Sequence, residues 1–146
     1  MASIPTKRLL SAFADSSALF AAAVSATGAA RELIARGIRG EIRVFLSEWV
    51  LEETQRNLSA KRPSALPALQ RLRDDLPEEL IDPPKSLVVR VAKVIEPKDA
   101  PIVAAAMAAK AQYLATYDRK HLLSQRDTIK AHFGIEVVLP DELLRL

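Results

Sequence analysis

Short apolar runs and longer helical stretches alternate along the whole chain. Four of the apolar runs have the length and composition of buried β-strands. They cover Leu9–Ala14, Ile42–Leu46, Tyr113–Thr116 and Glu136–Leu139. Because helical stretches separate these strands, the pattern predicts an α/β fold with a central parallel β-sheet and helices on both of its faces.

Capping and breaking residues divide the first helical stretch. A helix is predicted over the apolar region 18–30, with Gly28 as a point where it can break. It continues through Arg31–Arg36, after which Gly37 and Gly40 act as stop signals. Two helices or one bent helix are therefore expected before the second strand.

Further helices are predicted between the second strand and residue 95. Ser47 can cap a helix over about residues 48–60, and a polar helix follows over residues 65–75. Residues 87–95 are ambiguous, because Val88–Val91 has the composition of a strand. Apolar residues in this segment recur at i, i+1, i+4, i+7 and i+8 from Leu87, which is the spacing of one helical face, so we favour a helix. At the end of the chain, residues 140–144 are predicted to form a helical turn.

The segment Glu96–Leu123 combines a helix start, a helix, a strand and two candidate site acids, Asp99 and Asp118. Asp99 precedes Ala100-Pro101 and can accept hydrogen bonds from the N–H groups of the first helical turn. An Ala-rich helix follows over residues 102–111, and Asp118 lies just past the third strand. In an open α/β sheet, ligands bind beyond the carboxyl ends of the strands, so Asp118 and Asp99 are expected at a site.

Composition narrows the possible chemistry. The chain has 146 residues, 49% hydrophobic and 27% charged, which is typical of one soluble globular domain, here residues 1–146. Its 21 Lys and Arg against 18 Asp and Glu are compatible with a nucleic-acid partner but do not argue for one. The absence of Cys excludes disulfides, thiolate catalysis and Cys-based zinc sites. Any bound metal would therefore have hard oxygen ligands.

The N-terminus superficially resembles a short signal peptide. Lys7 and Arg8 precede an apolar run that ends in an Ala-x-Ala pattern before Asp15. The run is shorter than a usual signal sequence, and a buried first strand explains it better. No uninterrupted apolar run approaches the roughly 20 residues of a membrane span. We expect a soluble, cytoplasmic protein that does not enter a membrane.

Acidic residues recur where the predicted elements would bring them together. Asp15 follows the first strand as Asp118 follows the third, so both are expected at one edge of the sheet. The helix after Ser47 offers Glu52 and Glu53. At 100° per residue, Glu53 borders the apolar stripe of this helix whereas Glu52 points to water. Glu53 is therefore the third candidate, and Asp99 is the fourth.

Four carboxylates in one cleft repel one another unless a cation neutralises them. An oxygen-only set suits Mg²⁺ or Mn²⁺, which prefer carboxylate and water ligands. Such a metal would lower the pKa of a bound water and orient it for attack on a phosphodiester. The pattern therefore predicts metal-dependent hydrolysis without a protein nucleophile.

These residues resemble the motifs of the PIN domain nucleases. That family has an Asp ending the first strand, a Ser followed six residues later by Glu, a helix-starting Asp, and Thr-x-Asp after the next strand. The corresponding residues here are Asp15, Ser47 with Glu53, Asp99, and Thr116-Tyr117-Asp118. Each motif is short, but all four occur in order at matching element boundaries.

The resemblance implies a three-layer α/β/α fold and a metal-dependent endonuclease that acts on RNA. Small bacterial members are often toxins that a partner antitoxin holds inactive, and they commonly form homodimers. Many members carry a further acid two residues after the Thr-x-Asp aspartate. This chain has Lys120 there, followed by His121, which puts a second metal position in doubt.

Each candidate also has a purely structural interpretation. Asp15 and Asp99 can serve only as helix caps, Asp118 as a turn residue, and Glu53 as an exposed helix residue. These interpretations do not explain why all four acids fall where one sheet edge would collect them. His121 is expected to be a packing or surface residue rather than a metal ligand.

We therefore hypothesise a Mg²⁺- or Mn²⁺-dependent endoribonuclease with RNA as its partner. The candidate catalytic residues and metal ligands are Asp15, Glu53, Asp99 and Asp118. Ser16, Thr116 and Arg119 are candidates for positioning the substrate, and the basic residues Lys98, Lys120, Lys61 and Arg62 are candidate phosphate contacts.

Two other classes of function remain. A PIN-like module that binds RNA or protein and has lost useful catalysis is conceivable, because Lys120 departs from the family pattern. A phosphoryl-transfer domain of the receiver or haloacid dehalogenase type is disfavoured. The dehalogenase type requires an Asp two residues after Asp15, where this chain has Ser17.

Overall fold

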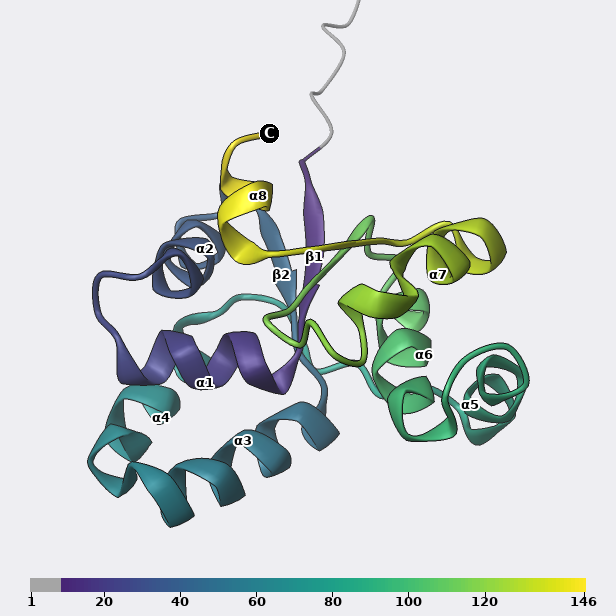
Figure 1. The fold of residues 1–146 in the computed structure, drawn as a ribbon. Coiled ribbons are helices and arrows are strands. Elements are labelled where there is room, and N and C mark those ends of the chain that lie inside the picture. The colour runs from purple at the N-terminus through teal and green to yellow at the C-terminus, as the bar shows by residue number, and fades with distance from the viewer. Residues whose placement is uncertain (1–8) are drawn as a thin grey trace, which may run out of the picture.

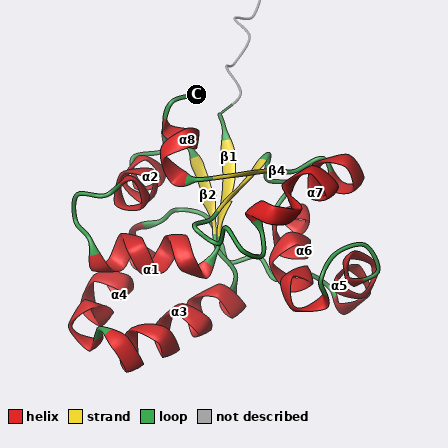
Figure 2. Cartoon of the chain, in the orientation of Figure 1, coloured by secondary structure: helices red, strands yellow, loops and turns green. Residues whose placement is uncertain are grey.

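The computed structural model describes residues 9–146 and has a four-stranded parallel sheet at its centre (Figure 1, Figure 2). The strands are β1 (Ser11–Ala14), β2 (Arg43–Phe45), β3 (Tyr113–Ala115) and β4 (Glu136–Val138). They lie in the order β2-β1-β3-β4. In the ladder, Phe13 pairs with Phe45 on one side and Leu114 on the other, and Leu114 pairs with Val137. The predicted parallel α/β fold is confirmed.

Helices cover both faces of this sheet. They are α1 (Ser16–Val24), α2 (Ala29–Ile38), α3 (Glu48–Lys61), α4 (Leu66–Asp75), α5 (Lys85–Ala92), α6 (Ala100–Ala108), α7 (Arg126–Phe133) and α8 (Pro140–Leu144). Figure 1 shows α1 to α4 on one side of the strands and α5 to α7 on the other, while α8 packs against α2. The arrangement is the expected three-layer sandwich.

The buried sheet explains the apolar runs of the sequence. A parallel sheet covered on both faces needs apolar side chains at successive positions rather than at alternate ones. Ala12, Phe13 and Ala14 of β1 are all fully buried, as are Leu114 and Ala115 of β3. The core thus fixes the strands, and it leaves the loops at their carboxyl ends free to carry polar residues.

Of the glycines predicted to break or end the first helical stretch, only Gly37 behaves differently. The break at Gly28 is confirmed, because α1 ends at Val24 and Gly28 is the N-cap of α2. Gly37, however, does not end α2. It is buried within the helix, where a Cβ atom would lie 2.7 Å from Cγ2 of Val44, so it permits close packing on β2. The chain leaves the helix at Gly40, whose φ is +77°.

The remaining helix predictions are confirmed with one omission. Residues 85–92 form α5, so the helical spacing rather than the strand-like composition was decisive. Helix α7 was not predicted, because its single buried residue, Ile129, leaves too few apolar positions to show a helical stripe. Gly134, with φ at +71°, ends α7 in the left-handed conformation.

Within residues 9–146, no single helix has both the length and the apolar character of a membrane span. Among these residues, only α1 and α2 taken together reach that length and apolar character, and they are bent by 95° to each other. The basic residues Lys7 and Arg8 of the signal-like N-terminus lie outside the described residues.

Candidate active site

The order of the strands puts the point where the chain connections reverse direction at the carboxyl end of β1. The chain passes from β1 to β2 on one side, and β3 lies on the other side of β1. Connections leaving two neighbouring strands in opposite directions open a space above their carboxyl ends, where ligands bind in α/β proteins. Asp15 follows β1, and Thr116 to Asp118 follow β3. The topology therefore places these residues at a common edge.

Asp15 lies at this edge of the sheet and is only 4% exposed. One carboxylate oxygen accepts hydrogen bonds from the backbone N–H of Ala18 at 3.0 Å and from Oγ of Ser17 at 2.7 Å. The residue thus caps α1 as well as facing β3. Burial raises the pKa of Asp15, and the nearby charge of Asp118 raises it further, while the hydrogen bonds it accepts lower it. The ionised carboxylate is therefore held in an unfavourable environment.

Thr116 joins Asp15 to Asp118. Its fully buried hydroxyl donates to the second carboxylate oxygen of Asp15 and accepts from the backbone N–H of Asp118 at 2.9 Å. Oδ1 of Asp118 accepts from the backbone N–H of His121 at 3.0 Å, so Asp118 also shapes the turn that follows it. The second oxygen of the Asp118 carboxylate has no such role in the turn.

Glu53 reaches the same edge from α3. Ser47 caps this helix as predicted, since its Oγ accepts from the backbone N–H of Val50 at 3.1 Å. Glu53 is half-buried while Glu52 is exposed, which confirms the choice made from helical geometry. Oγ of Ser16 donates a hydrogen bond to Glu53. Because Ser16 directly follows Asp15, this bond holds Glu53 close to the first acid.

Asp99 is buried and occupies the predicted N-cap position of α6, but its side chain does not form the predicted capping hydrogen bonds. It is 8% exposed and ends a 3₁₀ turn, Pro97–Asp99, in a helical conformation with φ −92° and ψ −12°. No hydrogen bond runs from the first turn of α6 to its side chain. Because the 3₁₀ turn leads directly into α6, the backbone of Asp99 is already helical. Its carboxylate accepts a hydrogen bond from Nε2 of Gln125 at 3.0 Å instead.

Gln125 connects the loop of Asp99 to the loop of Asp118. Its Nε2 also donates to the carbonyl oxygen of His121 at 2.8 Å, and its Oε1 accepts from the backbone N–H of Glu96 at 3.1 Å. One amide therefore holds two segments of the site together. The sequence did not indicate this role, because these partners lie up to 29 residues away and follow no local pattern.

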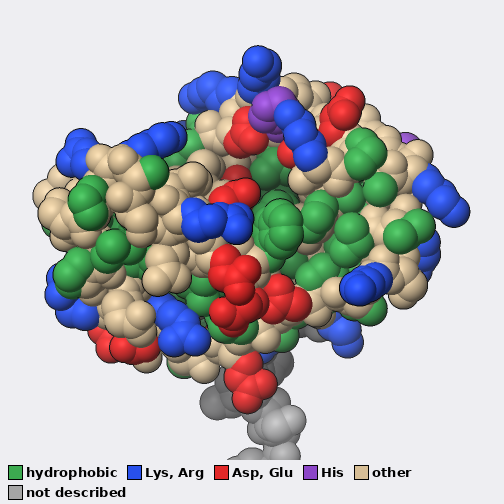
Figure 3. Space-filling view, turned by 90° about the horizontal axis from the view of Figure 1, so that it is seen from below, with side chains coloured by type: hydrophobic (Ala, Val, Ile, Leu, Met, Phe, Trp, Pro, Cys, Tyr) green, Lys and Arg blue, Asp and Glu red, His purple; other side chains and the backbone are tan. Residues whose placement is uncertain are grey.

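The four acids thus approach one another through intervening groups rather than by direct contact. In the described part of the chain, no three Asp, Glu or His side chains are already grouped closely enough to hold a metal ion. Among the same residues, none of the four acids forms an ion pair with a Lys, Arg or His. Figure 3 views the carboxyl-end face and shows Asp and Glu side chains along its middle, beside a hydrophobic patch.

Comparison with known proteins identifies the family. A model of the PIN domain matches residues 11–120, which include all four acids. The chain belongs to the PIN domain family. The crystal structure of PAE2754 from Pyrobaculum aerophilum has a TM-score of 0.62 over 93% of each chain, with 21% sequence identity, which shows a shared fold. The search of curated proteins gave no significant match.

The donor chemistry of this PIN domain suits a divalent cation. PIN domains are typically nucleases and generally bind divalent metals. The polar side chains that bond to one another around Asp15 are carboxylates and hydroxyls, which are hard oxygen donors of the kind that Mg²⁺ and Mn²⁺ prefer. A cation would also offset the cost of ionising buried Asp15. Asp15, Glu53, Asp99 and Asp118 are the residues that would hold it, and this set stays a prediction.

The other predicted residues fall into two groups. Ser16 and Thr116 bond directly to carboxylates of the site, which makes them positioning residues for the acids. Arg119 and Lys120 are exposed beside Asp118. Ser17 also bonds to a carboxylate of the site, that of Asp15, but was not predicted as a positioning residue. A serine two residues after an aspartate is a local motif that could have indicated this bond.

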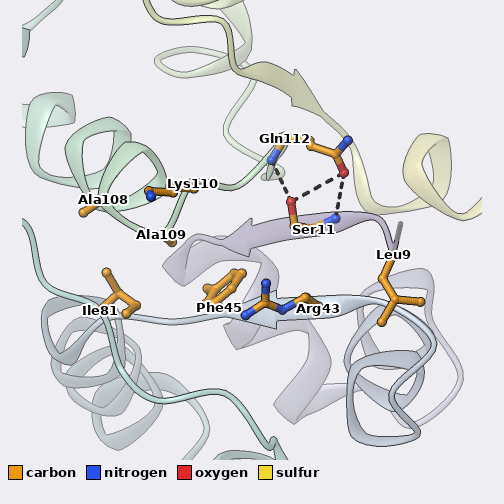
Figure 4. A pocket seen from close by; sticks show the side chains of 9 residues that line it. All are labelled: Leu9, Ser11, Arg43, Phe45, Ile81, Ala108, Ala109, Lys110 and Gln112. Atoms are coloured by element: carbon orange, nitrogen blue, oxygen red, sulfur yellow. Dashed lines mark hydrogen bonds between the residues drawn. The ribbon is translucent and has the colours of Figure 1, made fainter. Parts of the chain in front are cut away.

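A second cavity of about 560 Å³ lies along β1 and the edge strand β2 (Figure 4). Three of its polar side chains, those of Ser11, Arg43 and Gln112, have hydrogen-bond partners. The guanidinium of Arg43 forms hydrogen bonds of 3.0 and 3.2 Å with Glu78 and lies 5.0 Å from the ring centroid of Phe45. Gln112 accepts from the backbone N–H of Ser11 at 3.0 Å. None of the four acids lines this cavity, so it is not the candidate site.

Proposed function

We propose that this PIN domain is a Mg²⁺- or Mn²⁺-dependent endoribonuclease. The observation that supports the proposal is the buried carboxylate of Asp15, which lies near the charge of Asp118 without a cationic partner among residues 9–146. Such an arrangement costs stability unless a cation occupies the site. Proteins tolerate this cost where the charges serve a function.

In this proposal each residue has a defined part. Asp15, Glu53, Asp99 and Asp118 bind the cation, which supplies an activated water and stabilises negative charge on the phosphate. Thr116 and Ser16 fix the carboxylates of Asp15 and Glu53 through their hydroxyls. Gln125 holds Asp99 in place. Arg119 contacts the RNA strand beside Asp118.

The experiment is cleavage of a mixed pool of labelled RNAs by the purified protein. Reactions contain Mn²⁺, Mg²⁺ or EDTA, and Asp99→Asn is the matched variant, since an amide keeps the size of the side chain but removes its charge. We expect cleavage that needs both the metal and Asp99. Equal activity of wild type and variant, or no cleavage with either metal, would contradict the proposal.

A binding module without useful catalysis is the second candidate. Two observations favour it: the acids are not grouped ready to hold a metal within the described residues, and Lys120 stands where many members have an acid. A gel-shift assay run beside the cleavage reactions separates the two functions, because a binding module retains RNA without cleaving it. A cognate antitoxin and a homodimer, both expected from the family, belong with the nuclease proposal.

A further inference from the structure

A separate cavity of about 430 Å³ adjoins the acidic edge. Its wall consists of Glu96, Lys98, Lys120, His121, Ser124 and Gln125. These residues come from the two segments that precede α6 and follow β3, so neither segment alone forms the cavity. Figure 3 shows Lys, Arg and His side chains at one end of the acidic band on this face.

Two residues that line the cavity form hydrogen bonds with predicted metal ligands. Gln125 lines it and donates to the carboxylate of Asp99 at 3.0 Å. His121 lines it as well, and its backbone N–H donates to Asp118 at 3.0 Å. A group bound in the cavity is therefore separated from Asp99 only by Gln125, and from Asp118 only by His121.

The charged side chains of the cavity leave donors available. Nζ of Lys98 lies 3.2 Å from Nε2 of His121. An ammonium only donates hydrogen bonds, so Nε2 of His121 is the acceptor in this contact. This bond uses one of the three N–H groups of Lys98. In the described part of the chain, neither Lys98 nor Lys120 forms an ion pair with a carboxylate.

From these contacts we propose that the cavity is a phosphate subsite, which binds a backbone phosphate of single-stranded RNA next to the phosphate that is cleaved. The proposal rests on the nuclease function given above. Lys98 and Lys120 neutralise the bound phosphate and donate to its oxygens, as lysines do in nucleic-acid interfaces. The cation-binding acids and the phosphate-binding lysines thus hold neighbouring parts of one strand.

The shape of the subsite depends on the turn between residues 120 and 125. Oγ of Ser124 lies 2.7 Å from the carbonyl oxygen of Lys120 and 2.9 Å from that of His121. With Gln125 bonded to Glu96 and Asp99, the turn is fixed at both ends. A subsite that is held in this way loses little conformational entropy on binding.

Glu96 opposes a phosphate in the cavity. It is exposed at the wall, and its carboxylate repels an anion there. The acid therefore weakens binding, and its removal is a direct test of the charge of the ligand. A protein or peptide partner with a basic segment would show the opposite dependence.

The experiment measures the anisotropy of a short labelled single-stranded RNA in EDTA over a range of salt concentrations. The test variant is Lys98→Ala/Lys120→Ala. The control Lys110→Ala/Lys130→Ala removes the same charge away from the carboxyl edge, where Lys110 lines the other cavity and Lys130 pairs with Glu136. Circular dichroism melting confirms that each variant folds.

We expect the test variant to bind RNA at least about tenfold more weakly. The slope of log K against log salt should fall by about 0.7 for each phosphate that the variant no longer neutralises. The control should change little, and Glu96→Gln should bind more tightly. DNA of the same sequence should respond to the variants as RNA does, since both carry the phosphate. Equal reductions of affinity in test and control variants, or no RNA binding by wild type, would overturn the subsite.

Cleavage in Mn²⁺ separates this inference from the nuclease proposal. The test variant should raise KM and keep kcat, whereas Asp99→Asn should lose kcat and still bind RNA in EDTA. If no metal supports cleavage but binding in EDTA still depends on Lys98 and Lys120, the subsite stands and the nuclease proposal falls. If kcat falls while RNA binding is unchanged, the subsite is wrong.

Discussion

The carboxyl edge of the sheet and the cavity beside β2 differ in whether their charged groups are paired. Beside β2, Arg43 and Glu78 form a two-point ion pair. Ser11 and Gln112 form hydrogen bonds with each other, as Figure 4 shows. At the carboxyl edge, buried Asp15 lies near a second acid and no cation pairs with it among residues 9–146. Paired charges stabilise a fold or cost it little, whereas unpaired buried charges need an external partner. This difference is the reason why we propose the carboxyl edge, and not the cavity beside β2, as the ligand site.

The largest expected effect is the loss of cleavage in Asp118→Asn. The variant removes one predicted ligand charge without changing the size of the side chain. We expect the rate of RNA cleavage in Mn²⁺ to fall by about a thousandfold or more, since a bound metal contributes several kcal/mol to catalysis. Glu78→Gln is the matched control beside β2 and should leave the rate unchanged. Equal rates for both variants would remove the distinction between the two regions.

The two glutamines give the next contrast. Gln125→Ala deletes the amide that holds Asp99 and the loop after β3. We expect Mn²⁺ to bind about 10- to 100-fold more weakly, the usual cost of losing a group that orients a metal ligand. Isothermal titration calorimetry measures the affinity, with Gln112→Ala as control. Unchanged affinity in Gln125→Ala would show that Asp99 needs no such support or is not a ligand.

Gln112→Ala should instead lower stability. It removes the acceptor of the backbone N–H of Ser11, which begins β1. We expect unfolding in urea to require about 1 kcal/mol less free energy, at the low end for an unsatisfied group because water reaches this partly buried pair. RNA cleavage should stay at the wild-type rate. A clear loss of cleavage without loss of stability would assign a functional role to the β2 cavity.

In EDTA, Asp15→Asn should raise the stability of the fold, by less than Gln112→Ala lowers it. Since burial raises the pKa of Asp15 in the folded state, the folded protein binds more protons than the unfolded one between the ordinary carboxyl pKa and the raised value. Stability therefore falls as pH rises through that window, and the variant avoids this loss. We expect a higher Tm than wild type at neutral pH and no advantage at pH values below the ordinary carboxyl pKa.

Added metal should then reverse the order of stability. Mn²⁺ should raise the Tm of wild type but not that of Asp15→Asn, because only a folded protein with an intact site binds it. A wild-type Tm that does not respond to Mn²⁺ or Mg²⁺ would be inconsistent with a metal at Asp15.

The smallest effect is expected for Glu78→Gln. The side chain of Arg43 is 53% exposed and that of Glu78 is 23% exposed, so solvent screens their attraction. We expect the free energy of unfolding to change by less than about 1 kcal/mol. Urea unfolding at low and high salt measures it. A loss of unfolding free energy as large as that of Gln112→Ala would show that the Arg43–Glu78 pair stabilises the fold more than an exposed pair should.

Local patterns predicted much of the fold. The four strands and most helices followed from apolar runs and helical spacing, because each depends on residues within a few turns. Helix α7 was missed, since it buries only Ile129 and offers no stripe. Gly37 was misinterpreted as a stop signal, because the need for a residue without a Cβ atom comes from Val44 on a different element.

The candidate site was predictable only in part. Asp15 and Asp118 followed from their places after strands, and Glu53 from the angle it makes with the apolar stripe of α3. The predicted capping role of Asp99 was wrong, because a 3₁₀ turn precedes α6 and the side chain bonds to Gln125. Gln125 itself could not be predicted, since its bonds to Asp99 and Glu96 exist only after two distant loops have come together.

The sequence by itself determined the order and type of the elements, the set of hard oxygen donors and the absence of Cys chemistry, because these depend on residue identity and local periodicity. Tertiary structure decided which groups meet. The strand order β2-β1-β3-β4 set Asp15 beside the loop of Asp118, and the contact between residues 96–99 and 118–125 formed both the support of Asp99 and the basic cavity. Contacts between distant segments arise from packing of the whole chain, which no local pattern encodes.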